Sequence, residues 1–159
     1  PSPEAVRERL PLLVALDQIE DPHNYGAILR TAAAAGVAGV LVPRHHMAPL
    51  NAAALKASAG AALRVPIARV TNLTRTLETL KAHGFWVAGT SPSGEVSVWE
   101  MDWHRPLVLV LGNEGRGLRP GVAQACDLLV SIPLRGPVES LNVSVAAGIL
   151  LFAATRTRQ

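Results

Sequence analysis

The sequence predicts an α/β fold, a mostly parallel sheet with helices on both faces. Short continuous apolar runs such as residues 12–16 and 107–111 are typical of strands that are buried on both sides. Helical patterns alternate with these runs along the whole chain, and polar or glycine-rich turns separate the two. With 159 residues, 49% of them hydrophobic, the chain is long enough to bury one core. We therefore expect a single domain.

The first part of the chain predicts a βαβ unit. Residues 12–16 form the expected first strand, and residues 25–35 the expected first helix. Asn24 is the expected N-cap of this helix, and Gly36 is expected to end it. Residues 37–42 form the next strand. A strand, helix and strand in this order imply parallel pairing of the two strands.

The same alternation continues to the C-terminal region. Further helices are expected over residues 51–62, 73–82, 120–125 and 141–155, and further strands over residues 65–70, 85–89, 107–111 and 128–132. Gly84 is expected to end the second of these helices. No internal repeat or low-complexity linker interrupts this order.

Composition limits the class of protein. The formal net charge of +3 and the sequence pI near 9.8 permit a polyanionic partner without requiring one. Thirteen of the fifteen basic residues are Arg, which suits phosphate contacts but equally fits a biased genome composition. The single cysteine, Cys126, excludes an internal disulfide and is consistent with a reducing cytoplasm. Residues 143–154 are too short to span a membrane, which needs roughly 20 apolar residues.

The first chemistry-bearing stretch is Asp21-Pro22-His23-Asn24-Tyr25-Gly26, followed by Arg30. It lies between a buried strand and the start of a helix. One interpretation is structural: Asn24 caps the helix and Gly26 permits close packing. Arg30 is harder to explain in this way, because a guanidinium on a mostly apolar helix needs an anionic partner or a ligand. We therefore expect a functional role for Arg30.

The second and third stretches also follow predicted strands. Residues 112–117 are glycine-rich but lack the ending of a phosphate-binding P-loop and the spacing of a dinucleotide fingerprint. Glu114 in this stretch is expected either to contact a ligand or to pair with an Arg. In the third stretch, Ser140 or Asn142 would cap the last helix. A nucleophilic role for Ser140 is disfavoured, since no Gly-x-Ser-x-Gly elbow surrounds it.

The remaining polar and aromatic residues do not indicate a second site. His45 and His46 are adjacent in a loop and have no paired carboxylate, so we expect solvent exposure and no metal site. Trp86, Trp99 and Trp103 are interpreted as packing residues rather than as platforms for base stacking.

Taken together, three motifs contain the residues Asp17-x-x-x-Asp21-Pro22-x-Asn24-x-Gly26-Ala27-x-x-Arg30-Thr31-Ala32, Gly112-x-Glu114-Gly115-x-Gly117 and Ile132-Pro133-Leu134-x-Gly136-x-x-x-Ser140-Leu141-Asn142-Val143-Ser144. This set resembles the signature motifs of the SpoU, or TrmH-type, branch of the SPOUT RNA methyltransferases, over nearly the whole chain. The intervening residues 51–73 resemble the subgroup that methylates a guanosine ribose in large-subunit ribosomal RNA.

The resemblance implies a fold, a cofactor and a set of partners. The fold would be of the SPOUT type with a trefoil knot in the C-terminal third. The resemblance further implies S-adenosylmethionine as cofactor, structured RNA as substrate, a homodimer whose interface helps to form the site, and a cytoplasmic location. Many relatives carry an N-terminal RNA-binding domain, so residues 1–10 are expected to be a linker remnant and residues 11–159 the catalytic domain.

The resemblance also assigns the site residues. Those expected to hold the cofactor are Thr90, Gly112, Ile132, Leu134 and Leu141, and those expected around the methyl group and the ribose are Asn24, Arg30, Glu114, Ser140 and Asn142. A ribose 2′-hydroxyl would attack the sulfonium methyl in line. A guanidinium does not accept protons in proteins, so Arg30 is expected to bind the adjacent phosphate and favour the alkoxide, while Asn24 and Ser140 orient the ribose.

Three alternatives remain open from the sequence. The first is a tRNA ribose methyltransferase of the same family. The second is a catalytically silent module that grips structured RNA. The third is an enzyme that binds NAD or ATP at the loop after Gly112. Binding of S-adenosylmethionine separates the second and third alternatives from the methyltransferases.

Overall fold

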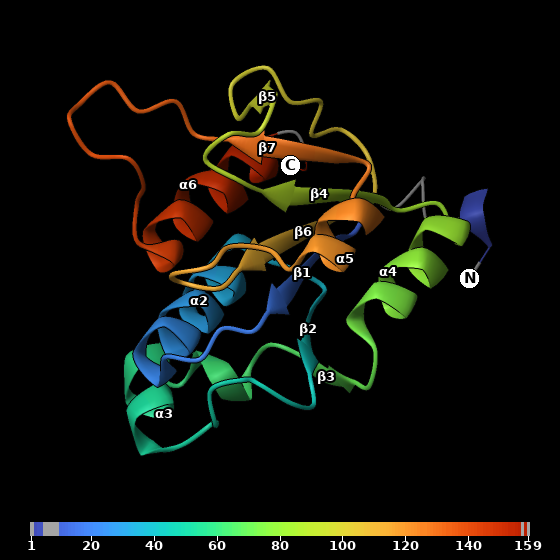
Figure 1. Cartoon of the computed structure of the whole chain (residues 1–159). Helices are drawn as coiled ribbons and strands as arrows, with labels where there is room; N and C mark the ends of the chain where they lie inside the picture. Colours follow the sequence, from blue (N-terminus) through green and yellow to red (C-terminus); the bar gives the residue numbers. More distant parts are fainter. Residues whose placement is uncertain (1, 5–9, 157, 159) are drawn as a thin grey trace.

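The computed structural model describes residues 2–4, 10–156 and 158. Residues 1 and 5–9, which belong to the predicted linker remnant, lie outside the described residues. Seven strands form one sheet in the order β3-β2-β1-β6-β4-β7-β5, and every pair of neighbours is parallel (Figure 1). The predicted α/β fold with a parallel sheet is confirmed.

The predicted strands follow one another in the expected order with small shifts of their ends, whereas the short strand β5 was not predicted. The strands are β1 (Leu12–Asp17), β2 (Gly39–Pro43), β3 (Ile67–Val70), β4 (Trp86–Thr90), β5 (Val96–Ser97), β6 (Leu107–Gly112) and β7 (Leu128–Ser131). The helices are α2 (Pro22–Ala35), α3 (Ala52–Ser58), the 3-10 turn η1 (Ala61–Leu63), α4 (Leu73–Ala82), α5 (Pro120–Ala125) and α6 (Val143–Thr155). In the part of the chain that the structure describes, no helix is long and apolar enough to cross a membrane.

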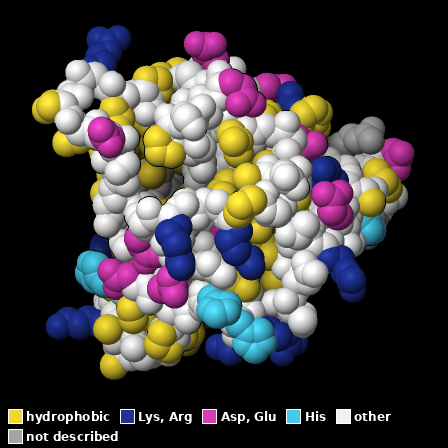
Figure 2. Space-filling model, in the orientation of Figure 1, with side chains coloured by type: hydrophobic (Ala, Val, Ile, Leu, Met, Phe, Trp, Pro, Cys, Tyr) yellow, Lys and Arg dark blue, Asp and Glu magenta, His cyan; other side chains and the backbone are white. Residues whose placement is uncertain are grey.

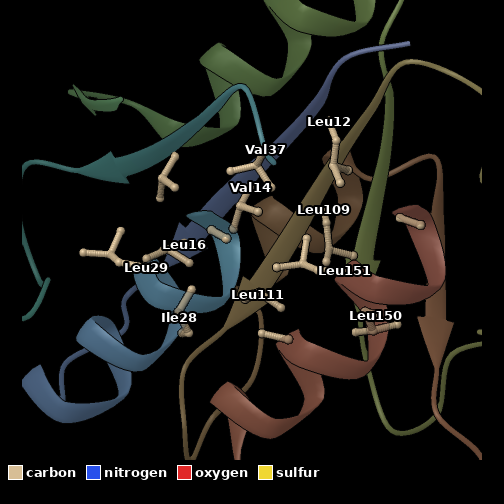
Figure 3. Close-up of a cluster of buried hydrophobic side chains, with 14 of the residues drawn as sticks. Leu12, Val14, Leu16, Ile28, Leu29, Val37, Leu109, Leu111, Leu150 and Leu151 are labelled. Carbon is tan, nitrogen blue, oxygen red and sulfur yellow. The ribbon is translucent and has the colours of Figure 1, made fainter. Parts of the chain in front are cut away.

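Alternate residues of the central strands belong to two hydrophobic clusters, one on each face of the sheet. On β1, Leu12, Val14 and Leu16 belong to the larger cluster, whereas Ala15 belongs to the smaller one. This is the period of two that a strand imposes on its side chains. The larger cluster lies under α2 and α6, as Figure 3 shows with Ile28 of α2 and other labelled residues between the helices and strands β1 and β6. The smaller cluster lies under α4 and α5.

Helix α2 begins earlier than predicted, and Asn24 is not its N-cap. Asp21 has that role: its side chain accepts a hydrogen bond from the backbone N–H of His23 at 2.9 Å. Pro22 is the first helical residue, where its fixed φ suits the helix and its missing N–H costs nothing. The C-terminal prediction is confirmed, because Gly36 ends the helix in the left-handed region at φ 74°.

Two further predictions differ from the structure. The helix expected over residues 51–62 is interrupted at Ala59 (φ 53°) and Gly60 (φ 84°), so that α3 and η1 are separate.

The interpretation of the tryptophans as packing residues is confirmed for Trp103, which is buried and donates to the carbonyl of Val98 at 3.1 Å. It is wrong for Trp99, which is 67% exposed. Trp86 is also exposed, and the guanidinium of Arg105 lies 4.1 Å from its ring centroid.

Helices α2 and α3 cross at Gly26 with no room for a side chain. A Cβ atom at this position would lie 2.2 Å from the carbonyl oxygen of Ala54 and 2.7 Å from Cβ of Ala57. The nearest atom belongs to the backbone, so it cannot move without moving α3. The small residue at position 26 therefore sets the distance between the two helices.

We predict that Gly26→Ala destabilises the fold by about 1–3 kcal/mol, the usual cost of overpacking, despite the better helix propensity of Ala. The measurement is the free energy of unfolding in urea. Gly136→Ala is the control, because a Cβ at position 136 meets no atom within 4 Å; we expect its effect to stay within about 0.5 kcal/mol. Equal stability of the two variants would contradict the prediction.

Candidate active site

An open cavity of about 940 Å³ lies at the carboxyl ends of β4, β6 and β7. In parallel α/β sheets this edge is where ligands bind, because the loops that follow the strands meet there. The lining residues come from the end of β4 with the loop after it, from the loop between β6 and α5, from β7, and from the segment that joins β7 to α6. The second and third sequence motifs both contribute residues to this lining.

Seven of the ten predicted site residues line the cavity. They are Thr90, Gly112, Glu114, Ile132, Leu134, Ser140 and Leu141. The other three, Asn24, Arg30 and Asn142, are not part of the lining. The structure therefore brings together all five residues predicted to hold the cofactor, and separates part of the predicted catalytic set from them.

The loop between β6 and α5 is a compact turn. The backbone groups of Asn113 and Gly117 exchange two hydrogen bonds of 3.0 Å, and the side-chain oxygen of Asn113 accepts from the backbone N–H groups of Gly115 and Arg116. Gly112 has no space for a Cβ atom, which would lie 2.5 Å from the carbonyl carbon of Gly117. Gly117 itself has a φ of 69°, which favours glycine. The glycines of the second motif thus allow the loop to fold back on the strand.

Glu114 ties this loop to the loop between β1 and α2. Its carboxylate accepts hydrogen bonds from the backbone N–H groups of Asp21 at 2.7 Å and Glu20 at 3.3 Å. The sequence predicted a ligand contact or an Arg partner for Glu114. The structure gives it backbone donors at the start of α2 instead, while its side chain also lines the cavity. Glu114 therefore holds the first motif against the cavity rim.

A second set of contacts strengthens the same junction. The side-chain amide of Asn113 donates to the carbonyl of Gln18 at 2.7 Å and to the carboxylate of Glu20 at 2.8 Å. Arg116 pairs with the same carboxylate oxygen of Glu20 at 2.7 Å. Sequence reasoning did not select Asn113, Glu20 or Arg116. Their pairing depends on which strands are neighbours, and the sequence does not contain that information.

The deepest contact at the junction is an ion pair between Asp17 and Arg119, in which only the carboxylate is buried. The carboxylate of Asp17, at the end of β1, is completely buried and accepts from the side-chain Nε and the backbone N–H of Arg119, both at 2.7 Å. Asp17 appeared in the first motif, but the sequence assigned it no role. An acidic residue at the end of a buried apolar strand is the signal that could have identified it, since a buried charge requires a partner.

The three predicted residues outside the lining have different surroundings. Asn24 is buried, and its side-chain amide donates to the Asp21 carboxylate at 3.4 Å. Asn142 caps α6, as predicted, by accepting from the backbone N–H of Ser144 at 2.8 Å. Arg30 is exposed on α2, and among the described residues no carboxylate lies within 4.0 Å of it. The anion expected for Arg30 is thus not supplied by that part of the chain.

Other nucleophilic or metal-binding groups do not contribute to this site. Burial raises the pKa of the Cys126 thiol to about 12, so it is protonated at neutral pH and unreactive. Its Sγ donates to the carbonyl of Val122 at 3.3 Å. Within residues 2–4, 10–156 and 158, no three His, Cys, Asp or Glu side chains are grouped in a way that could hold a metal ion.

Comparison with known proteins agrees with the motifs at the site. The profile of the SpoU rRNA Methylase family matches residues 11–152. The chain belongs to this family. A relative from Pseudomonas aeruginosa named 23S rRNA (guanosine-2'-O-)-methyltransferase RlmB is 50% identical over 151 residues, which is 95% of this chain and 61% of the relative. The chain thus spans about three fifths of the length of that family member.

Solved structures of family members have the same fold. The SpoU methyltransferase AviRb from Streptomyces viridochromogenes, in complex with AdoMet, aligns with a TM-score of 0.86 and 31% identity over 95% of this chain and 61% of AviRb. A TrmH/SpoU tRNA modifying enzyme from A. aeolicus aligns with a TM-score of 0.85 and 36% identity over 98% of this chain and 80% of that enzyme.

We predict that Asp17→Asn lowers the free energy of unfolding by about 2–3 kcal/mol. The substitution removes the buried negative charge that accepts two hydrogen bonds from Arg119, and the loss stays below that of fully buried pairs because the Arg119 side chain is half-exposed. Asp102→Asn is the matched control, because it breaks the exposed pair of Asp102 with Arg105 and should cost less than about 1 kcal/mol. Urea unfolding of both variants measures the difference. Similar losses in the two variants would contradict a special role for Asp17.

Proposed function

We propose that residues 11–159 are the catalytic domain of an S-adenosylmethionine-dependent RNA ribose 2′-O-methyltransferase that acts on a guanosine of large-subunit ribosomal RNA. One observation carries the proposal: the second and third family motifs, which α5 and β7 separate in the sequence, line a single cavity at the carboxyl edge of the sheet. The name of the P. aeruginosa relative, 23S rRNA (guanosine-2'-O-)-methyltransferase RlmB, supports the reaction and the substrate.

The cavity residues fit S-adenosylmethionine. The volume of the cavity, about 940 Å³, is at the upper end of the range for ligand pockets. The apolar side chains of Leu129, Ile132, Leu134 and Leu141 suit a purine ring, and Thr90 with the backbone around Gly112 offers polar contacts. The structure of AviRb with AdoMet, which has the same fold, supports this cofactor.

The residues of the chain would act by positioning. S-adenosylmethionine would supply a methyl group on a positively charged sulfur, and a ribose 2′-oxygen of the RNA would receive it as the carbon–sulfur bond breaks, with S-adenosylhomocysteine as the leaving group and the hydroxyl proton passing to water. The rigid loops around Glu114 hold the start of α2 at the cavity rim, which limits the number of orientations open to the substrate. Asn24 and Ser140 would orient the ribose, and Asn142 would keep the start of α6 in place.

Arg30 would stabilise charge rather than remove the proton. Its guanidinium stays protonated in proteins, so it donates hydrogen bonds and does not accept a proton. The side chain is exposed and has no ion-pair partner among the described residues, so it is available to a phosphate of the substrate. A cation beside the 2′-oxygen lowers the cost of forming the alkoxide.

The proposal includes a homodimer in the cytoplasm. Val145 and Phe152 of α6 are 52% and 47% exposed, and Val138, in the segment before α6, is 58% exposed. Apolar side chains on the surface of one helix suit a contact between two copies. Because Arg30 lies on α2, which packs against α6, such a contact would bring Arg30 close to the partner subunit.

The proposal also includes the trefoil knot of the SPOUT fold. Strand β4 lies between β6 and β7 in the sheet although it precedes both in sequence. After β7 the chain returns to place α6 against β6 and α2, on the face opposite α5. This order of strands and this return path are the features that support a threaded C-terminal region.

A tRNA substrate is the second candidate. The observation that favours it is the alignment with the A. aeolicus tRNA modifying enzyme. The chain covers 80% of the length of that enzyme, which is more than it covers of the rRNA-specific relative.

The experiment that decides between the two substrates is transfer of a tritiated methyl group from S-adenosylmethionine to unmodified ribosomal RNA and to unmodified tRNA, with the modified nucleotide mapped afterwards. We expect 2′-O-methylguanosine in the large-subunit RNA. Absence of transfer to either RNA, or of cofactor binding by calorimetry, would overturn the proposal.

We predict that Arg30→Ala reduces methyl transfer at least 100-fold, the scale typical for loss of a group that stabilises developing charge. Binding of S-adenosylmethionine should be unchanged, because Arg30 does not line the cavity. Arg156→Ala removes another exposed cation and serves as the control. Near-normal turnover of Arg30→Ala would remove Arg30 from the mechanism.

A further inference from the structure

The positive charge of the chain is concentrated in one segment. Residues 22–77 contain six Lys or Arg residues and no Asp or Glu. The other residues contain nine Lys or Arg and all twelve Asp and Glu residues. The modest net charge of +3 therefore combines a segment of formal charge +6 with a remainder of −3. This segment forms α2, α3 and the sheet edge made by β2 and β3.

Part of this charge lies at the carboxyl edge of β2 and β3. Arg44, His45 and His46 directly follow β2, Arg69 is in β3, and Arg75 is in the first turn of α4. We call these five residues the basic rim. All five are exposed. In Figure 2, Lys, Arg and His side chains lie along the lower border of the molecule, where Figure 1 shows β2, β3 and α3, and no Asp or Glu is visible along that border.

The arginines of the basic rim have no partners within the described part of the chain. None of Arg44, Arg69 and Arg75 has a carboxylate within 4.0 Å there. Arg116 in the cavity lining and Arg119 in the same loop differ from them, since both are paired with carboxylates. Arg75 also stands near the N-terminus of α4, where the helix dipole disfavours a positive charge. These charges are thus not explained by the stability of the fold.

The basic rim is held in a defined position. The backbone N–H of Arg44 donates to the carbonyl of Val70 at 2.9 Å, and that of Ala48 donates to the carbonyl of Ile19 at 2.7 Å. Ile19 directly precedes the residues that Glu114 binds. Ala48 is buried in the core, so the loop is anchored by its apolar side while its cations face solvent. The basic rim is therefore rigidly connected to the loop of the first motif.

Arg69 lies on the side of the sheet that carries α2. Burial raises the pKa of the Tyr25 phenol, and the positive charge of Arg69 partly offsets this effect. The two residues are thus close enough to interact, although Tyr25 belongs to the first turn of α2 and Arg69 to β3. Arg69 consequently extends the basic rim toward the start of α2.

The basic rim and the cavity lie along one edge of the molecule. All strands are parallel, so the residues after β2 and β3 lie at the same edge as those after β6 and β7. Neighbouring strands are about 4.8 Å apart, which places the end of β2 about 10 Å from the end of β6. A long substrate with one nucleotide in the cavity would therefore extend over the basic rim.

We propose that the basic rim binds the phosphodiester backbone of the substrate RNA beside the nucleotide that enters the cavity. Arginine suits this role because its guanidinium forms paired hydrogen bonds with phosphate oxygens. A second copy of this chain is disfavoured as the occupant, because two surfaces of the same charge repel each other. The identification of the bound polyanion as RNA rests on the proposed function.

The test measures RNA affinity as a function of salt. Unmodified large-subunit ribosomal RNA, transcribed in vitro, is bound to the protein by filter binding across a series of salt concentrations. The variants are Arg44→Gln, Arg69→Gln, Arg75→Gln and the triple variant, with Arg156→Gln as the control for loss of an exposed cation outside the segment. Calorimetry with S-adenosylmethionine is carried out on every variant to verify that the cavity is intact.

We expect each single variant to weaken RNA binding about three- to tenfold and to reduce the slope of log affinity against log salt by about 1. The triple variant should lose about 2 to 3 from that slope, whereas Arg156→Gln should stay within about twofold of the wild type. Cofactor affinity should be the same in all. Wild-type affinity and slope in the triple variant would overturn the proposal, and so would an equal effect of the control.

The outcomes separate this proposal from the proposed function. If the wild-type chain transfers no methyl group and takes up no S-adenosylmethionine, yet the triple variant loses salt-dependent RNA binding, the proposed function fails and the RNA surface stands. If methyl transfer occurs and the triple variant binds RNA normally, the surface fails and the function stands. Should the triple variant unfold, the single variants decide. The proposal that the basic rim binds RNA would be overturned if the wild-type chain bound no RNA, or if it bound an acidic protein in place of RNA.

Discussion

The geometry of the site depends on the contact between the Asp17 carboxylate and Arg119. The carboxylate terminates β1 with a charge that is fully buried, and both of its oxygens are occupied by Arg119. β1 and β6 are neighbours at the centre of the sheet, so this one side chain fixes the chain that leaves β6 against the chain that leaves β1. Glu114 and Asn113 can then reach the backbone before α2. The buried charge of Asp17 must be neutralised locally, and its pairing with Arg119 holds the first and second motifs next to each other.

The rigid sheet explains why the cavity is restricted to one edge. Leu109 and Leu111 of β6 pack toward α2 and α6, while Val108 and Val110 pack toward α4 and α5, and all are fully buried. Neither face of the central strands is open to a ligand, so only the loops beyond the strands can bind one. The glycines of the β6–α5 loop are compatible with this arrangement, since at Gly112 even a Cβ would collide with the returning backbone.

Local signals predicted the elements well where one signal was dominant. The bounds of α4 and α5 agree with the prediction, because Asn72 is a clear cap and Pro120 a clear first residue. At α2, Asp21 and Asn24 are both good caps, and only Pro22 distinguishes them. The interruption after Ser58 has a local signal in Gly60, but the positive φ of Ala59 has none, since alanine rarely adopts it. The motifs located most of the cavity lining, whereas the partners of Asp17 and Glu114 follow from the strand order, which no local pattern contains.

The distribution of charge connects the cavity to the surface beside it. At the junction of the first two motifs, Asp17 and Glu20 neutralise Arg119 and Arg116, so the arginines nearest to Glu114 are occupied by the fold. The segment that follows has no acidic residue until Glu78, and its cations remain unpaired among the described residues. A polyanion that approaches this edge therefore meets free positive charge over β2 and β3 before it meets the cavity. Because such attraction is long-ranged and non-specific, it would guide the substrate, and the shape of the cavity would select the nucleotide.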